Sequence, residues 1–468
     1  MRQKLEGRKA EIIDRLAELA KERLGDTGKA AEAEAFLRLF YRNVPAEDMQ
    51  AEDALHLFGA GMALWRFAET RTPAQPKIRA YNPRIDEDGW HLTHTVVEIV
   101  NDDMPFLVDS VTAELNRREL GVHLVIHPVV VVVRDAKGKR KSLAKDAKGG
   151  TAESMMQIHV SARSSAEALD QIQTGLASVL NDVRAAVTDW RAMRQKLLEV
   201  VSRIESDPPP LPAEEIKEGI EFLRWLEADH FTFLGYRDFK YEAASGRMAV
   251  NPESGLGVVR DPAFHVFGGM RNISELPAEV RAEIERPLLI NISKGNRQSS
   301  VHRPVLLDVI TIKDIAKNGA VVGQWQAVGL FTSVAYNESV RSIPLLRRKV
   351  AETLRRAGFT PGSYNGKNLA TILEAYPRDE LLQIDQDLLF DTAMGILHLQ
   401  ERQRIALFLR PDTFRRFMSA LVYVPRDIYN TELRRRFQAI IEQSLNGPVT
   451  QFYTQISDSV LARLHFIV

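Results

Sequence analysis

The residues best suited to bind a small molecule form one short segment between an apolar stretch and a helical pattern. A helix N-terminus presents free backbone N–H groups that can hold a carboxylate, and Asp102 or Asp103 could bind an amino group. The simpler interpretation is that these carboxylates cap the helix that follows. Spacing alone leaves both interpretations open. The candidate residues are Asn101, Asp102, Asp103, Met104, Pro105, Phe106 and Leu107.

Motifs for catalysis or nucleotide binding are missing from the sequence. Gly59-Ala60-Gly61 lies inside a helical pattern, and Gly255-Leu256-Gly257 is not followed by the third glycine of a dinucleotide-binding loop. The phosphate-binding pattern GxxxxGK[ST] and the zinc pattern HExxH do not occur, and there is no cysteine. We therefore expect no catalytic residue, no cofactor-binding residue and no metal site in this chain.

Histidines give no metal-ligand pattern either. His91 and His94 are three residues apart on an expected strand, so their side chains point to opposite faces. His123 and His127 share a face of the next strand, but no third ligand has a suitable spacing. We interpret them as ordinary core or surface residues.

Composition limits the partners and the compartment. The 468 residues exceed one core and suggest three to four domains. Lys+Arg and Asp+Glu both number 62, which argues against nucleic acid or an anionic membrane as a partner. The N-terminus lacks an apolar signal core, and no uncharged stretch is long enough to cross a bilayer, so we expect a cytoplasmic protein. The apolar end, Leu464–Val468, suggests a cut inside a longer protein.

The elements around the candidate segment predict a small α+β module. Residues 1–72 have helical periodicity, and Pro73 and Pro76 then begin a linker. Residues 73–206 read strand, helix, strand, strand, helix, with Gly121 ending the first helix. This order predicts a ferredoxin-like sandwich with helices on one face of an antiparallel sheet. The expected strands are His91–Val100, Val122–Arg134 and Ser154–Ala162.

The rest of the chain repeats this α+β character. Residues 213–338 predict an antiparallel, PAS-like α+β module in which a strand is interrupted near Gly235. Its strands Leu288–Ile292, Pro304–Lys313 and Ala320–Thr332 include a hairpin signal at Asn318-Gly319. Residues 339–403 read as a helical segment, and residues 404–468 read strand, strand, helix, strand, strand. The predicted fold class is α+β, with several small antiparallel modules joined by helical segments.

The candidate segment resembles an ACT domain. In that family a D-x-P-G-x-L turn precedes the helix, and this sequence has Asp103-Met104-Pro105-Phe106-Leu107-Val108, with Phe106 where the family has glycine. Gly121 matches the glycine before the family's second strand. The resemblance implies an effector site at Asn101–Leu107 and Gly121. The phenylalanine at the family's glycine position argues against close approach of a ligand to the backbone there.

A wider resemblance covers nearly the whole chain, in order. The segments that carry it are Phe40–Pro45, Asp229–Arg237, Gly329–Ser333, Ala335–Asn337, Ile343–Val350 and Tyr376–Leu381. They resemble the N-terminal regulatory region of the large bacterial NAD-specific glutamate dehydrogenases, whose catalytic and NAD-binding domains lie downstream. The parent reaction would convert L-glutamate and NAD to 2-oxoglutarate, ammonium and NADH. The resemblance carries no catalytic residue onto this chain.

Three hypotheses follow for the chain itself. It senses a small effector such as an amino acid; it is purely a structural oligomerisation platform; or it is a self-contained enzyme, which glutamate-dependent NADH production by the chain alone would establish. The first two imply its own downstream catalytic domains and sister subunits as partners.

Overall fold

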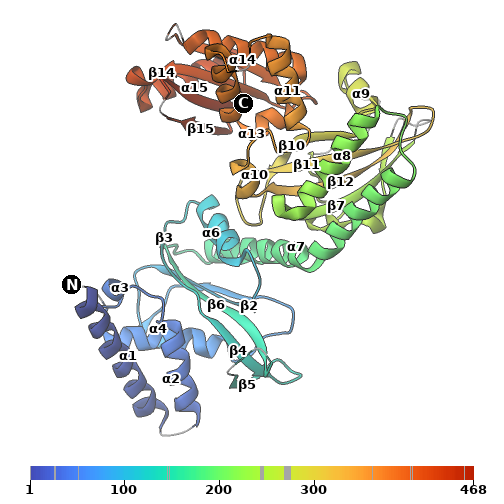
Figure 1. Ribbon diagram of the computed structural model, residues 1–468. Coiled ribbons are helices and arrows are strands. Elements are labelled where there is room, and N and C mark those ends of the chain that lie inside the picture. Colours follow the sequence, from blue (N-terminus) through green and yellow to red (C-terminus); the bar gives the residue numbers. More distant parts are fainter. Residues whose placement is uncertain are drawn as a thin grey trace. The chain divides into compact units, whose positions relative to one another are not determined.

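The chain forms two compact units (Figure 1). Unit 1 comprises Met1–Val187 and Ser299–Pro304, and unit 2 comprises Thr188–Gln298 and Val305–Val468. The computed structural model describes residues 2–25, 28–50, 52–144, 146, 148–242, 247–267, 276–360, 362–400, 402, 404–457 and 459–468. None of the helices in these ranges is both long and apolar enough to span a membrane.

Unit 1 begins with four helices, in the segment where the periodicity predicts helical structure. Apolar residues at helical spacing, among them Leu16, Phe36 and Leu64, are fully buried together in one cluster. Asp53 caps the fourth helix by accepting a hydrogen bond from the Leu55 N–H at 2.7 Å. The helices are α1 (Arg2–Leu24), α2 (Gly28–Phe40), α3 (Ala46–Gln50) and α4 (Ala54–Phe67).

An antiparallel sheet follows, with the order β1-β2-β6-β4-β5 and with β3 also paired to β6. Its elements are β1 (Lys77–Tyr81), α5 (Ile85–Asp88), β2 (Thr95–Asp102), α6 (Leu107–Arg117), β3 (Val122–Ile126), β4 (Val129–Arg134), β5 (Arg140–Leu143), β6 (Thr151–Val160) and α7 (Ala166–Ser206), of which α7 contributes to both units.

Helices cover both faces of this sheet, because the N-terminal helices add a layer that lies outside the predicted βαββα module. Side chains alternate between the faces of a strand. Val100 and Met155 pack into the cluster of the N-terminal helices, while Asn101 contacts α7 on the opposite face. The sequence did not reveal this because the N-terminal helices precede the module and bring their own apolar face to it.

Two expected strands of unit 1 also need correction. The strand expected at His91–Val100 starts only at Thr95 and continues through Asp102. The strand expected at Val122–Arg134 breaks at His127-Pro128, because proline lacks the N–H that a sheet requires. Its two halves, β3 and β4, pair with successive parts of β6.

Unit 2 contains a second antiparallel sheet, with the order β10-β11-β12-β7-β8 and β9 on β7. The interruption expected near Gly235 is a bulge at Leu234, since Val328 pairs with Gly235 but Gly329 pairs with Phe233. The hairpin expected at Asn318-Gly319 is confirmed. The elements are α8 (Ala213–Trp225), a π turn (Leu226–His230), β7 (Phe231–Glu242), β8 (Arg247–Val250), β9 (Leu256–Gly257), α9 (Ala278–Glu285), β10 (Ile290–Gln298), β11 (Leu306–Ile315), β12 (Val321–Phe331), α10 (Ser333–Asn337) and 3₁₀ turns at Pro252–Ser254 and Val258–Arg260.

The remainder of unit 2 is a helical layer and a third antiparallel sheet, with the order β13-β14-β16-β15. Val422 and Phe466 pack with the helix α15 on one face, and Leu421 and Tyr423 join the main cluster of unit 2 on the other. The elements are α11 (Leu346–Ala357), α12 (Tyr364–Ala375), α13 (Arg378–Gln383), α14 (Gln386–Gln400), β13 (Ala406–Pro411), β14 (Met418–Pro425), a 3₁₀ turn (Arg426–Ile428), α15 (Thr431–Leu445), β15 (Gln451–Gln455) and β16 (Leu461–Ile467).

The fold class is therefore α+β with several antiparallel sheets, as predicted. The five-part division of the chain, with its PAS-like assignment of residues 213–338, stays a prediction.

Candidate functional site

The candidate segment spans the last two residues of β2, the turn of residues 103–106 and the first residue of α6. Asp103 and Pro105 are exposed, Met104 and Phe106 are half-buried, and Leu107 is buried at the start of α6. The Asp103 N–H donates to the Ala152 carbonyl at 3.0 Å, which ties the turn to β6.

Neither carboxylate caps α6, so the capping interpretation is wrong. The N-cap position belongs to Phe106, and its side chain makes no capping hydrogen bond. The N–H groups before Ser110 precede the first intrahelical bond, which Ser110 N–H donates to the Phe106 carbonyl at 3.1 Å.

Phe106 adopts a backbone conformation that favours glycine. Its φ is 70°, in the left-handed region, where a Cβ atom is strained. This explains why the resembled turn has glycine here, and it shows that the turn keeps its path with phenylalanine. The Phe106 ring lies 5.0 Å from the His302 ring, centroid to centroid. His302 Nδ1 is also 3.1 Å from Asp109 Oδ2 in the first turn of α6.

Asn101 and Asp102 are held by arginines rather than being free for a ligand. Arg184 on α7 donates from Nη1 to Asp102 Oδ2 at 2.6 Å and from Nη2 to Asn101 Oδ1 at 2.5 Å. Arg71 donates from Nη2 to Asp102 Oδ1 at 2.5 Å. The expectation that Asp102 binds an amino group therefore needs correction, because both of its oxygens already accept from guanidinium groups.

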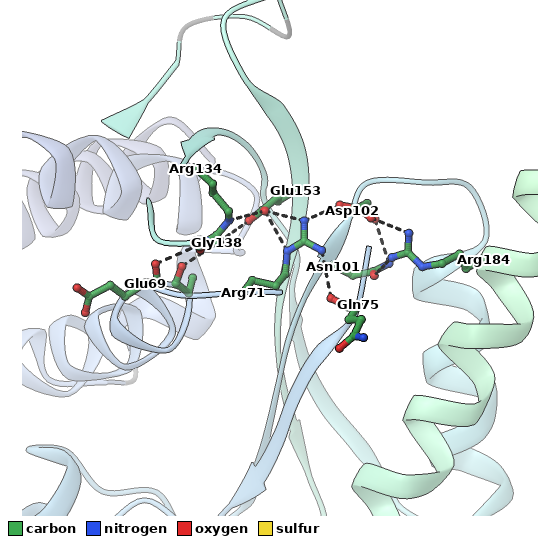
Figure 2. Close-up of polar contacts among 10 residues, drawn as sticks. Glu69, Arg71, Gln75, Asn101, Asp102, Arg134, Gly138, Glu153 and Arg184 are labelled. Atoms are coloured by element: carbon green, nitrogen blue, oxygen red, sulfur yellow. Dashed lines mark hydrogen bonds and ion pairs between the residues drawn. The ribbon is translucent and has the colours of Figure 1, made fainter. Parts of the chain in front are cut away.

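Glu153 on β6 is the centre of this ionic network (Figure 2). Its side chain is fully buried and accepts from Arg71 Nε and Nη2 at 3.0 and 2.8 Å. Arg134 donates to both Glu153 oxygens at 2.7 Å and also to the carbonyls of Glu69 and Gly138. The network joins β2, β4, β6, α7 and the segment before β1.

The network carries an excess of positive charge. Three arginines face two carboxylates, Asp102 and Glu153. Burial opposes ionisation of Asp102, but the hydrogen bonds from Arg71 and Arg184 outweigh it and lower the pKa of this carboxyl. The Nε of Arg184 is buried without a partner among the described residues. An anionic group near the turn is favoured by this charge.

Gly121 lies far from the turn. Val122 pairs with Val160, but Asp102 pairs with Glu153, seven residues away along β6, or roughly 24 Å at ~3.4 Å per residue. The Gly121 N–H donates to Ser161 Oγ at 3.2 Å. The eight candidate residues thus do not form one site.

Histidines gather at the Gly121 end of the sheet. The His94 and His123 rings are 4.2 Å apart, and His123 Nε2 is 3.5 Å from Ser161 Oγ. Burial, followed by the repulsion of His94 and His123, lowers the pKa of His159 to about 4. The described residues contain no group of three His, Cys, Asp or Glu side chains arranged to hold a metal ion.

Sequence reasoning missed the arginines and Glu153. Arg71 lies 82 residues from Glu153 in the sequence, and Arg184 lies 82 residues from Asp102. The one available signal was Arg184, a charged residue beside Val183 in the apolar seam of a long helix. His302 is nearly 200 residues from the turn and carried no signal.

Family comparisons match three parts of the chain. Residues 36–176 match the "Glutamate dehydrogenase, ACT1 domain", residues 343–402 match "Glutamate dehydrogenase, helical motif 1", and residues 406–468 match the "Glutamate dehydrogenase, ACT2 domain". The candidate turn and most of the ionic network lie in the first of these matches.

Longer relatives are named as NAD-specific glutamate dehydrogenases. The chain is 40% identical to the NAD-specific glutamate dehydrogenase of Halomonas elongata over 98% of this chain and 29% of that protein. It is 37% identical to that of Pseudomonas aeruginosa over 98% of this chain and 28% of the relative. That of Mycobacterium tuberculosis is 28% identical over 80% of this chain and 22% of the relative. The chain thus spans less than a third of the length of these relatives.

Proposed function

Because this chain belongs to the NAD-specific glutamate dehydrogenase family and corresponds to its N-terminal region, we propose that it is the regulatory, non-catalytic part of such an enzyme. The parent reaction is the conversion of L-glutamate and NAD to 2-oxoglutarate, ammonium and NADH, in the cytoplasm. In this proposal the downstream domains supply catalysis and bind NAD, and this chain contacts them and sister subunits.

The topology of the sheets supports this division of labour. Dinucleotide-binding folds place the cofactor at the ends of parallel strands. The paired strands of the described residues are antiparallel in the three sheets. We therefore assign NAD binding to residues outside this chain.

The effector in this proposal is a small amino acid bound at the β2–α6 turn. The observation that carries it is the exposed Asp103 in the turn before α6, whose first N–H groups precede the first intrahelical bond. The N–H groups would hold the α-carboxylate and Asp103 the α-amino group. The Arg71–Asp102–Arg184 contacts support the site by fixing the end of β2 and adding positive charge. Such a site typically delivers a coupling of ~1–3 kcal/mol.

Calorimetry of the chain against the common amino acids tests effector binding. We expect saturable heat from at least one amino acid, and its loss in Asp103→Asn. Asp48→Asn, at an exposed carboxylate of α3, is the matched control and should bind as the wild type does. Absence of heat from the whole panel at millimolar concentrations would argue against sensing. Activity of the full-length enzyme with and without this region then gives the sign of regulation.

A purely structural oligomerisation platform is the second candidate. The edge strands of the third sheet expose apolar side chains: Leu407 and Leu409 on β13, and Phe452 and Tyr453 on β15. A second copy of the chain would cover such residues. This candidate predicts a concentration-dependent assembly in light scattering that does not change when amino acids are added.

A further inference from the structure

A cavity of about 480 Å³ lies on one face of the second sheet, over residues of β7, β8, β10, β11 and β12. Figure 1 shows these strands in unit 2. The sheet is its floor, and residues from the segment 258–267 and from α9 line its walls. A cavity of this size is in the range that accommodates small molecules.

The floor of the cavity is a polar row that crosses four strands in register. Asn291 pairs with Thr311, Thr311 with Gln326, and Gln326 with Arg237. Residues directly opposite one another in neighbouring strands share a face of the sheet. Neighbours on the other face, such as Ile310, pack into the main cluster of unit 2. Because polar and apolar side chains alternate along these strands, the polar face would be expected to face solvent, yet the side chains of this row are buried.

Three side chains of this row have no hydrogen-bond partner among the described residues. Asn291, Thr311 and Gln326 are 7%, 7% and 6% exposed. Within the part of the chain that the structure describes, no hydrogen bond engages their side chains, and all three line the cavity. The row thus presents donors and acceptors to whatever occupies the cavity.

Two buried cations add to the row. Arg237 and Lys313 are 7% and 3% exposed and line the same cavity. Arg237 donates to the Val259 and Asp261 carbonyls, and Lys313 donates to the Glu283 and Arg286 carbonyls at 2.8 and 2.7 Å. Neither forms an ion pair with a carboxylate of the described residues.

One carboxylate also lines the cavity. Glu283 forms an ion pair with Arg286 at 3.5 Å, and its charge partly offsets that of Lys313. Burial nevertheless lowers the pKa of Lys313 to about 8. Arg237 and Lys313 together still outweigh the single carboxylate Glu283, so the charges that line the cavity favour an anion.

The opposite wall of the cavity is apolar and aromatic. Phe264, Val266 and Phe267 belong to the segment over the sheet, and Phe414 and Val259 complete this side. A ligand that satisfies both sides needs a charged, hydrogen-bonding end and an apolar body. We propose that this cavity binds a small organic carboxylate, with the carboxylate on the Arg237–Gln326–Thr311–Asn291 row and the apolar body against Phe264 and Phe267.

The proposal is tested by calorimetry on the whole 468-residue chain with 3-phenylpropionate as the probe. Its neutral amide, 3-phenylpropanamide, has the same body without the charge. Thr311→Val removes one hydroxyl of the row without changing the side chain's shape. Thr392→Val makes the same change at a buried threonine of α14, away from the cavity, and is the matched control. Arg237→Met removes the cation.

We expect saturable binding of 3-phenylpropionate at millimolar concentrations or below. Binding should weaken about tenfold for the amide and severalfold in Thr311→Val, should be lost in Arg237→Met, and should be unchanged in Thr392→Val. The proposal is overturned if the probe does not bind, if acid and amide bind equally, or if Thr311→Val binds like Thr392→Val. The Thr311 comparison remains decisive if Arg237→Met fails to fold.

Discussion

Replacing Glu153 by glutamine should strongly destabilise unit 1. Its carboxylate accepts four hydrogen bonds, at 2.7–3.0 Å, from the guanidinium groups of Arg71 and Arg134. The Glu153 side chain is fully buried, and those of Arg71 and Arg134 are 3% and 10% exposed, so water screens little of this interaction.

The glutamine amide would direct its own N–H donors toward guanidinium donors, and the network would change from one to two excess positive charges. Breaking a buried ion pair by removing one charge costs about 3–5 kcal/mol. We expect a loss of that size for Glu153→Gln.

The measurement is hydrogen–deuterium exchange of the β6 amides under native conditions, which reports the opening free energy of unit 1 alone. Glu18→Gln is the control, since Glu18 pairs with Arg15 at 2.9 Å but is 64% exposed. An exposed pair contributes ~0–1 kcal/mol. If Glu153→Gln changes β6 opening no more than Glu18→Gln does, the network does not stabilise the end of the sheet and the reasoning is refuted.

Three further predictions concern the same region. Because Phe106 has a φ of 70°, Phe106→Gly should be more stable than Phe106→Ala by roughly 1 kcal/mol in thermal unfolding, and equal stabilities would contradict the strain. Gly138→Ala should lower the stability of unit 1 distinctly more than Gly89→Ala. Both glycines have positive φ, but only at Gly138 would a Cβ lie 2.0 Å from the Arg71 carbonyl oxygen. Equal shifts of the two urea unfolding midpoints would contradict this prediction. The folded-state pKa of Asp102 lies below its ordinary value of about 3.9, so its contribution to stability is present above that pH and is lost as pH falls through the lower pKa. Asp102→Asn should therefore flatten the acid side of the stability curve of unit 1. An unchanged slope would count against the lowered pKa.

Much of the fold could be predicted from local patterns. Helical periodicity predicted the N-terminal helices. Gly358 ends α11 because glycine readily adopts the left-handed conformation of a helix C-terminus, and its φ is 64°. Asn318-Gly319 gave a hairpin because Gly319, with a φ of 83°, supplies the positive φ that this turn requires. These features depend on neighbours in the chain, so the sequence determines them directly.

The candidate site was predicted only in part. The segment Asn101–Leu107 does connect a strand to a helix, although Asn101 and Asp102 are still in the strand, and the roles of its residues depended on distant partners. Asp102 is held by two arginines, and Gly121 is at the other end of the sheet. Only strand pairing and the packing of α7 bring those arginines to the turn.

By itself, then, the sequence determined the α+β class and the order of most elements, because periodicity and turn chemistry act over a few residues. The tertiary structure decided which polar groups are buried and what they contact. Glu153 and Arg71, and the row from Asn291 to Arg237, lie on separate segments whose hydrogen bonds exist only after the sheets form. The physical reason is that the free-energy cost of desolvating a charged or amide group, and its need for a hydrogen-bond partner, arise only when folding buries the group.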